Sequence, residues 1–173
     1  MKEIEHKKIK RRIRLLLILF IFGLVFGCQL VLFVRPELGW LNNIFGEGTR
    51  MGENFPNLSA WISHLYEGIT ETYSKYPFMA YCMDWLAFAQ LVFVVFFIGA
   101  IADPVRNIWI IKSGMVICVL HILLAFGSGS FRGVPLFWRF LDSSFGFIGF
   151  IVLYIVYRNV KYLETRPANK FGS

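Results

Sequence analysis

The chain has 173 residues, of which 57% are hydrophobic and 18% aromatic, and its formal net charge is +7 at pH 7. This composition excludes an ordinary water-soluble domain. The basic residues gather near the two ends of the chain, so the positive charge indicates orientation in a membrane and no nucleic-acid partner. The length allows one membrane domain, which we place at residues 15–158.

The first 14 residues are strongly basic, with seven lysines and arginines against two glutamates. An apolar run over 15–34 follows, and together the two segments resemble the charged and apolar regions of a signal peptide. The apolar run continues through Val34, however, which gives it the length of a full span rather than of a short leader. We therefore expect an uncleaved first transmembrane helix.

The polar segment after this span divides into a loop and a helix. Residues 37–56 are rich in Gly, Pro and Asn, which is typical of a loop. Residues 58–75 carry apolar side chains at helical spacing, which predicts an amphipathic helix in this first outer loop. The helix would either cover the outer end of the bundle as a lid or lie in the membrane interface. Its apolar stripe consists of Leu58, Trp61, Ile62, Leu65, Tyr66, Ile69 and Tyr73.

Three further apolar runs are long enough to span the hydrocarbon layer: 85–102, 108–126 and 137–157. A short turn joins the first two of these runs, and residues 127–130, which are Gly and Ser, are expected to end the third span and open a second outer loop. Small residues on the last span predict close packing against a neighbouring helix. They are Ser143, Gly146 and Gly149.

The distribution of charge predicts how these four spans are oriented. Basic residues predominate in 1–14 and in the tail 159–173, whereas the first outer loop has more acidic than basic residues. Because cytoplasmic segments carry the excess of Lys and Arg, both termini are expected in the cytoplasm. The predicted fold class is all-α integral membrane, a four-transmembrane-helix bundle with an extra amphipathic helix in the first outer loop.

Several segments in the second half of the chain resemble segments of small four-helix inner-membrane proteins of bacteria. They are Met83–Ala89, Asp103–Asn107, Arg132–Arg139 and Asp142–Gly146. The resemblance implies the four-span topology, and it supplies no activity to carry over to this chain. We expect the chain in the bacterial inner membrane, with the lipid bilayer as a partner.

Six polar or charged residues lie in or near the spans, where such groups require partners: Gln29, Asp84, Gln90, His121, Arg139 and Asp142. Gln29, Gln90 and His121 lie at a similar depth, about 7–9 Å below the outer boundary at 1.5 Å per residue, and the charged residues lie above them. Arg132 in the second outer loop joins five of them in the candidate set Asp84, Gln90, His121, Arg132, Arg139 and Asp142. Arg139 and Asp142 are three residues apart on one helix and can pair, with Asp84 in reach of Arg132 or Arg139. All six are candidate ligand-binding residues.

Two interpretations of this polar cluster remain open. A structural network would hold the helices together, and Asp84 and Asp142 would also interact favourably with the helix N-termini near which they lie. A binding site would take a small polar ligand or a lipid head group, with Arg132 and Arg139 contacting phosphate or carboxylate. If the chain is instead a membrane enzyme, His121 is the candidate catalytic residue, because histidine exchanges protons near neutral pH.

The sequence contains no P-loop, nucleophile elbow, zinc-protease or dinucleotide-binding motif, so it assigns no cofactor. The three cysteines have no metal-ligand spacing, and no metal is expected. A third interpretation is a purely structural subunit of a membrane complex. The partners left open are therefore a lipid or small polar ligand, another membrane protein, or a second copy of the chain.

Overall fold

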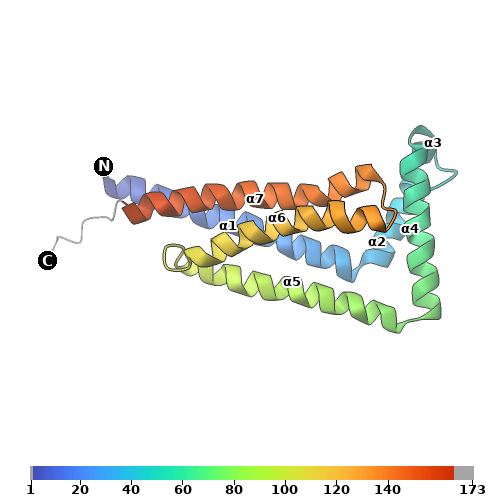
Figure 1. Ribbon diagram of the computed structural model, residues 1–173, viewed down its shortest axis with the longest axis horizontal. Coiled ribbons are helices and arrows are strands. Elements are labelled where there is room, and N and C mark those ends of the chain that lie inside the picture. Colours follow the sequence, from blue (N-terminus) through green and yellow to red (C-terminus); the bar gives the residue numbers. More distant parts are fainter. Residues whose placement is uncertain (1, 166–173) are drawn as a thin grey trace. The chain divides into compact units, whose positions relative to one another are not determined.

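The computed structural model describes residues 2–165, with side chains from residue 4 onward, and this stretch is helical without strands (Figure 1). The helices are α1 (Lys2–Leu32), α2 (Val34–Phe45), α3 (Arg50–Asn54), α4 (Pro56–Lys75), α5 (Phe78–Ala102), α6 (Ile108–Phe131) and α7 (Leu136–Thr165). They form two compact units. One contains residues 2–23 and 93–165, and the other is Leu24–Val92, so α1 and α5 contribute to both.

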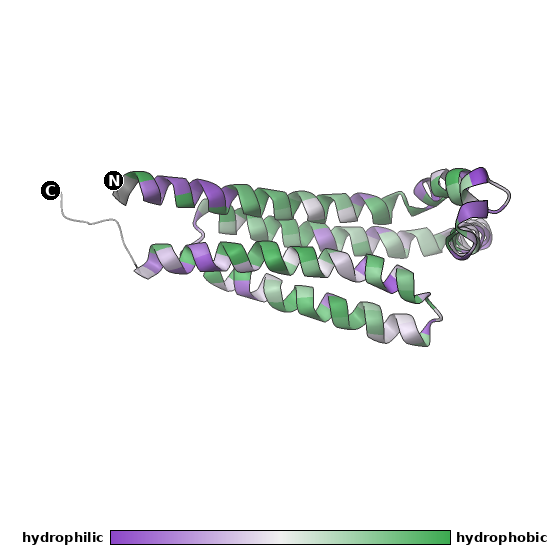
Figure 2. Cartoon of the chain, turned by 90° about the horizontal axis from the view of Figure 1, so that it is seen from above, coloured by the Kyte–Doolittle hydropathy of each residue, from purple (hydrophilic) through white to green (hydrophobic). Residues whose placement is uncertain are grey.

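Four helices are long and apolar enough to cross a membrane: Ile4–Leu32, Phe78–Ala102, Ile108–Phe131 and Leu136–Thr165. Each contains one of the apolar runs predicted from the sequence, except that α1 ends at Leu32 rather than at residue 34. Figure 2 shows hydrophobic colouring along these helices and hydrophilic colouring at the start of α1. The described part of the basic segment 1–14 is therefore continuous with the first apolar helix. This all-helical architecture is compatible with a membrane bundle.

In the unit formed by residues 2–23 and 93–165, α6 and α7 lie side by side and antiparallel (Figure 1). Small residues permit this close approach. A Cβ atom added at Gly146 would lie 2.9 Å from the carbonyl oxygen of Cys118, and one added at Gly149 would lie 3.0 Å from the Cys118 sulfur. Ser143 is fully buried on the same helix. The predicted small face of the last span is confirmed, and it packs on α6.

The core of this unit also includes the first part of α1 and the end of α5. The rings of Phe20 and Phe97 lie with their centroids 4.7 Å apart. The hydroxyl of Tyr162 donates to the Glu5 carboxylate at 3.1 Å, so the start of α1 lies beside the end of α7. The largest fully buried apolar side chains of the unit are Ile13, Leu17, Ile111, Leu153, Val156 and Val160.

The unit Leu24–Val92 corrects the predicted loop at 37–56, because most of this segment is helical, in α2 and α3. Pro36 lies in the first turn of α2, where its missing N–H has no helical partner to lose. Gly39 packs against the Tyr66 ring, 3.2 Å from where a Cβ would lie. The turn between α2 and α3 uses Gly48 at a φ of 78°. Its glycines therefore serve packing and one turn, and not a long loop.

A helix was predicted over 58–75, and α4 occupies Pro56–Lys75. It packs on α2 through buried side chains that include Ile62. The Ser63 hydroxyl donates to the Asn42 side-chain oxygen at 2.8 Å and accepts from the Glu47 N–H at 3.1 Å. These bonds fix α4 on α2 and on the turn that follows α2.

The ends of α6 and α7 also differ from their predicted positions. Residues 127–130 continue α6, which ends only at Phe131, and Gly133 turns the chain at a φ of 68°. Serine and glycine have low helix propensity but are tolerated near a helix end. Here packing against α7 stabilises the additional helical turn. The predicted tail 159–173 continues α7 as far as Thr165, and residues 166–173 lie outside the described residues.

Candidate functional site

A cavity of about 290 Å³ opens where α6 turns into α7. Both helices and the turn between them contribute to its wall, and three of the six predicted site residues are included. The lining residues are His121, Leu124, Ala125, Ser128, Gly129, Arg132, Val134, Asp142 and Phe145. The cavity thus places an imidazole, a guanidinium and a carboxylate from neighbouring segments around one space.

His121 reaches across from α6 to α7. Its Nε2 atom lies 3.0 Å from the backbone carbonyl oxygen of Asp142, and because a carbonyl only accepts, Nε2 carries the proton of this hydrogen bond. The other ring nitrogen, Nδ1, is then an acceptor in the neutral ring. Such a nitrogen can take a proton from a bound molecule, which is the property that a general base needs.

Gly146 makes this contact between the helices geometrically possible. A Cβ atom at this position would lie 3.1 Å from Cδ2 of His121 and 2.8 Å from the Ile122 side chain. The imidazole therefore occupies space that any larger residue would fill. Packing between α6 and α7 and the position of His121 depend on the same glycine.

Arg132 stands at the end of α6, with an exposed side chain. Its Nε atom donates to the Ser128 hydroxyl at 3.2 Å, one helical turn earlier. This bond leaves the outer nitrogens of the guanidinium for a ligand in the cavity. Ser128 was missed as a site residue because residues 127–130 were expected to lie in a loop. Had a continuous helix been expected here, the four-residue spacing would have predicted that Ser128 and Arg132 share one face of it.

Arg139 closes the turn between α6 and α7. Its Nε donates to the carbonyl oxygen of Val134 at 2.6 Å, and its Nη1 donates to the Ser130 hydroxyl at 2.7 Å. The aliphatic part of the side chain lies over Gly129, 3.1 Å from the position of an added Cβ. The ion pair expected between Arg139 and Asp142 is not formed in the described part of the chain, because the guanidinium is held by these backbone and hydroxyl acceptors instead.

Asp84 and Gln90 belong to the other compact unit, and their grouping with the cavity stays a prediction. Asp84 lines a shallow cavity of about 250 Å³ together with three aromatic side chains of α5, Tyr81, Trp85 and Phe88. Burial raises the pKa of Tyr73 on α4 above its ordinary value of 10.0, and the charges of Asp84 and Cys82 raise it further. The start of α5 therefore lies near the end of α4.

Gln90 packs against α1 within the same unit. A Cβ atom added at Gly27 would lie 3.5 Å from the Gln90 side-chain oxygen. This oxygen is buried and accepts no hydrogen bond from the described residues. Nearby, the Cys28 thiol lies 3.5 Å from the carbonyl oxygen of Ala87. These contacts join the second part of α1 to the first part of α5.

The described residues contain no group of three or more His, Cys, Asp or Glu side chains placed to hold a metal ion. Comparison of the chain with family models, curated proteins and solved structures found no match.

Proposed function

We propose that this chain is an integral membrane protein of the bacterial inner membrane and that the cavity at the α6–α7 turn binds a small polar ligand or a lipid head group. Both termini are cytoplasmic in this proposal, and the cavity opens toward the opposite side. The orientation is supported by the basic residues of 1–14 and by the positive-inside rule. In this orientation α4 is the amphipathic helix of the first outer loop, with Ile62 buried and Glu67 and Glu71 exposed.

The observation that carries the proposal is the placement of Arg132, Asp142 and His121 around one cavity. Arginine binds phosphate or carboxylate oxygens with two parallel hydrogen bonds, and these bonds are strong where little water competes. The Asp142 carboxylate and the His121 imidazole, which line the same cavity, can accept hydrogen bonds from hydroxyl or ammonium groups. A ligand with an anionic group and a neighbouring hydroxyl or amine fits this set of side chains best.

Binding of sn-glycerol 3-phosphate, a soluble fragment of a lipid head group, tests the proposal. Isothermal titration of the protein in detergent should show binding that Arg132→Gln weakens about 10–100-fold, since a hydrogen bond to a charged group contributes about 1.5–3 kcal/mol. Arg106→Gln is the matched control, because Arg106 is exposed in the turn before α6. Absence of binding by the unaltered chain, or equal affinities for the two variants, would contradict the proposal.

A membrane enzyme acting on a lipid-soluble substrate is the second candidate. The hydrogen bond from His121 Nε2 to the Asp142 carbonyl favours it, because this bond leaves Nδ1 as a proton acceptor on a residue that lines the cavity. In that case His121→Gln should remove turnover of the substrate while binding persists. A purely structural subunit would instead show neither ligand binding nor turnover, and Arg132→Gln would give the same titration as the unaltered chain.

A further inference from the structure

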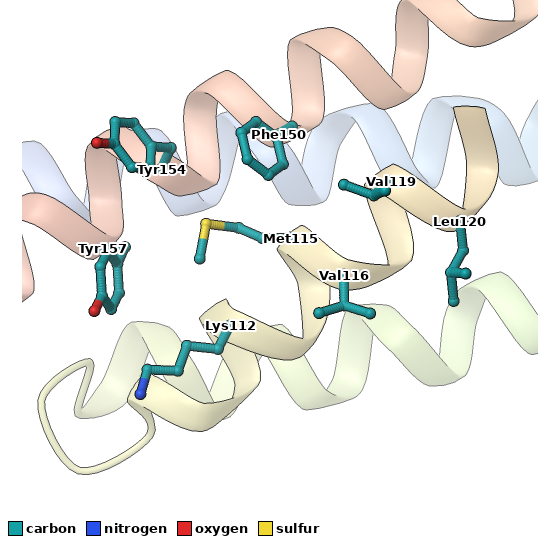
Figure 3. A pocket seen from close by; sticks show the side chains of 8 residues that line it. All are labelled: Lys112, Met115, Val116, Val119, Leu120, Phe150, Tyr154 and Tyr157. Carbon is teal, nitrogen blue, oxygen red and sulfur yellow. The ribbon is translucent and has the colours of Figure 1, made fainter. Parts of the chain in front are cut away.

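A second, larger cavity lies between α6 and α7 at the end opposite to the candidate site. Its volume is about 460 Å³, which is within the range of about 300–1,000 Å³ usual for ligand sites. Figure 3 shows Lys112 at one end of it, with Tyr154 and Tyr157 from α7 facing side chains of α6. Lys112 is its one charged residue, and the remaining wall is aliphatic or aromatic.

The wall of this groove follows one face of each helix. On α6 the lining residues recur at helical spacing from Lys112 to Leu120, a stretch that covers about 12 Å along the helix axis at 1.5 Å per residue. On α7 the rings of Phe150 and Tyr154 are nearly parallel, with their centroids 6.3 Å apart. A hydrocarbon layer is about 30 Å thick, so the groove reaches most of the way through one leaflet.

Charge is confined to one end of the groove. The Lys112 ammonium lies 5.9 Å from the centroid of the Tyr157 ring. Tyrosine is enriched where hydrocarbon meets the head-group region, and lysine extends its charge to that level. Other exposed basic side chains lie at the same end of the unit, including Arg106 before α6 and Arg158 on α7. This end is therefore positively charged, whereas the groove that leads away from it is apolar.

We infer that this groove binds an anionic phospholipid of the cytoplasmic leaflet, with one acyl chain between α6 and α7 and the phosphate on Lys112. The inference rests on the proposed membrane orientation and is independent of the ligand at the other end of α6. The cytoplasmic leaflet carries the anionic lipids that attract basic residues. A transmembrane partner helix fits less well, because the groove ends within one leaflet and a partner would have to supply an acid for Lys112.

Native mass spectrometry of the detergent-purified chain with equal amounts of phosphatidylglycerol and phosphatidylcholine tests this inference. The unaltered chain should retain phosphatidylglycerol preferentially, and Lys112→Gln should reduce that preference about fivefold, the factor expected for one basic residue near an anionic surface. Lys161→Gln is the matched control, because Lys161 already pairs with Glu164 at 2.6 Å. Equal retention of both lipids, or an unchanged preference in Lys112→Gln, would overturn the inference.

Filling the groove gives a second measurement that does not depend on charge. Val119 is 43% exposed and lines the groove, so Val119→Phe should fill part of it and reduce the number of retained phosphatidylglycerol molecules. Val95→Phe adds the same bulk at a residue that is 68% exposed and lies outside the groove, and it should change nothing. If Val119→Phe instead abolished a dimer seen with the unaltered chain, the groove would be an interface between copies and the inference would be wrong.

Loss of lipid preference must be distinguished from failure of the proposed orientation. Labelling of cysteines introduced one at a time at Arg106 and Arg132, in intact cells and in a chain whose own cysteines are replaced by serine, reports which side of the membrane each residue faces. A reversed orientation overturns the assignment to the cytoplasmic leaflet, whereas the expected orientation with no lipid preference overturns the lipid site alone.

Discussion

Gly146 offers the sharpest test of the packing between α6 and α7. An added Cβ would lie 2.8 Å from the Ile122 side chain and 2.9 Å from the Cys118 carbonyl, whereas ordinary contacts begin at 3.4 Å. The carbonyl belongs to helical backbone and cannot move alone, so Gly146→Ala must separate the two helices by roughly half an ångström. Overpacking of this kind typically destabilises a protein by about 1–3 kcal/mol.

The control for this variant is Gly127→Ala on α6. A Cβ atom added at Gly127 meets no atom within 4 Å, so the substitution supplies only the helix propensity of alanine, about 1 kcal/mol. The difference in the free energy of unfolding between the two variants therefore measures the clash itself. Titration of both proteins in mixed detergent with sodium dodecyl sulfate, followed by tryptophan fluorescence, should place Gly146→Ala about 1–3 kcal/mol below Gly127→Ala. Equal unfolding midpoints would refute the reasoning.

Three further predictions concern single side chains. Arg139→Lys should destabilise the protein by about 1–3 kcal/mol in the same titration, because the ammonium of lysine does not match the two acceptors, Val134 and Ser130, that the planar guanidinium serves with separate nitrogens. Arg132→Gln is the control and should not lower the stability. Equal stability of the two variants would argue against this role of Arg139. Burial raises the pKa of Tyr73 above 10.0, so the stability that this tyrosine contributes should be lost as the pH rises through the raised pKa. Asp84→Asn should move its absorbance titration to lower pH, and an unmoved titration would contradict the charge interaction. Thr49→Ala removes the hydroxyl that caps α3 at 3.0 Å, which should speed hydrogen exchange of the capped amide about fivefold, and an unchanged rate would exclude the cap.

The four apolar helices could be predicted from the sequence because their signal is summed over many residues. An apolar run as long as 108–126 is expected to form a helix whatever its neighbours are, because a helix satisfies all its backbone hydrogen bonds internally. The close packing at Gly146 and Gly149 could be predicted for a similar reason, because small residues on one face of an apolar helix have few other uses.

The segment 37–56 shows where composition is a poor guide. Its glycines and its one proline are common in loops, but Pro56 begins α4 and Gly39 lies against a tyrosine ring from α4. The contact of Gly39 depends on Tyr66, which is distant in the sequence. A reading of local composition therefore cannot distinguish a packed glycine from a flexible one.

The candidate site could be predicted only in part, because its contacts also depend on residues that are distant in the sequence. Helical spacing places Arg139 near Asp142. It cannot predict that Ser130 and Val134, which come from another helix and a turn, compete with Asp142 as acceptors for the guanidinium. The meeting of His121 with the Asp142 carbonyl could not be derived either, because it depends on the register of α6 against α7. Residue type identified the candidates, and tertiary packing decided their contacts.

The two hydrogen bonds of Arg139 bear on how the protein is made. In the proposed orientation the short connection between α6 and α7 has to be translocated through the bilayer during biogenesis. A guanidinium that already donates to Val134 in that connection and to Ser130 in the last turn of α6 enters the hydrocarbon with fewer bare donors, which lowers the barrier to crossing. The two helices would then insert together as a preassembled hairpin rather than one after the other.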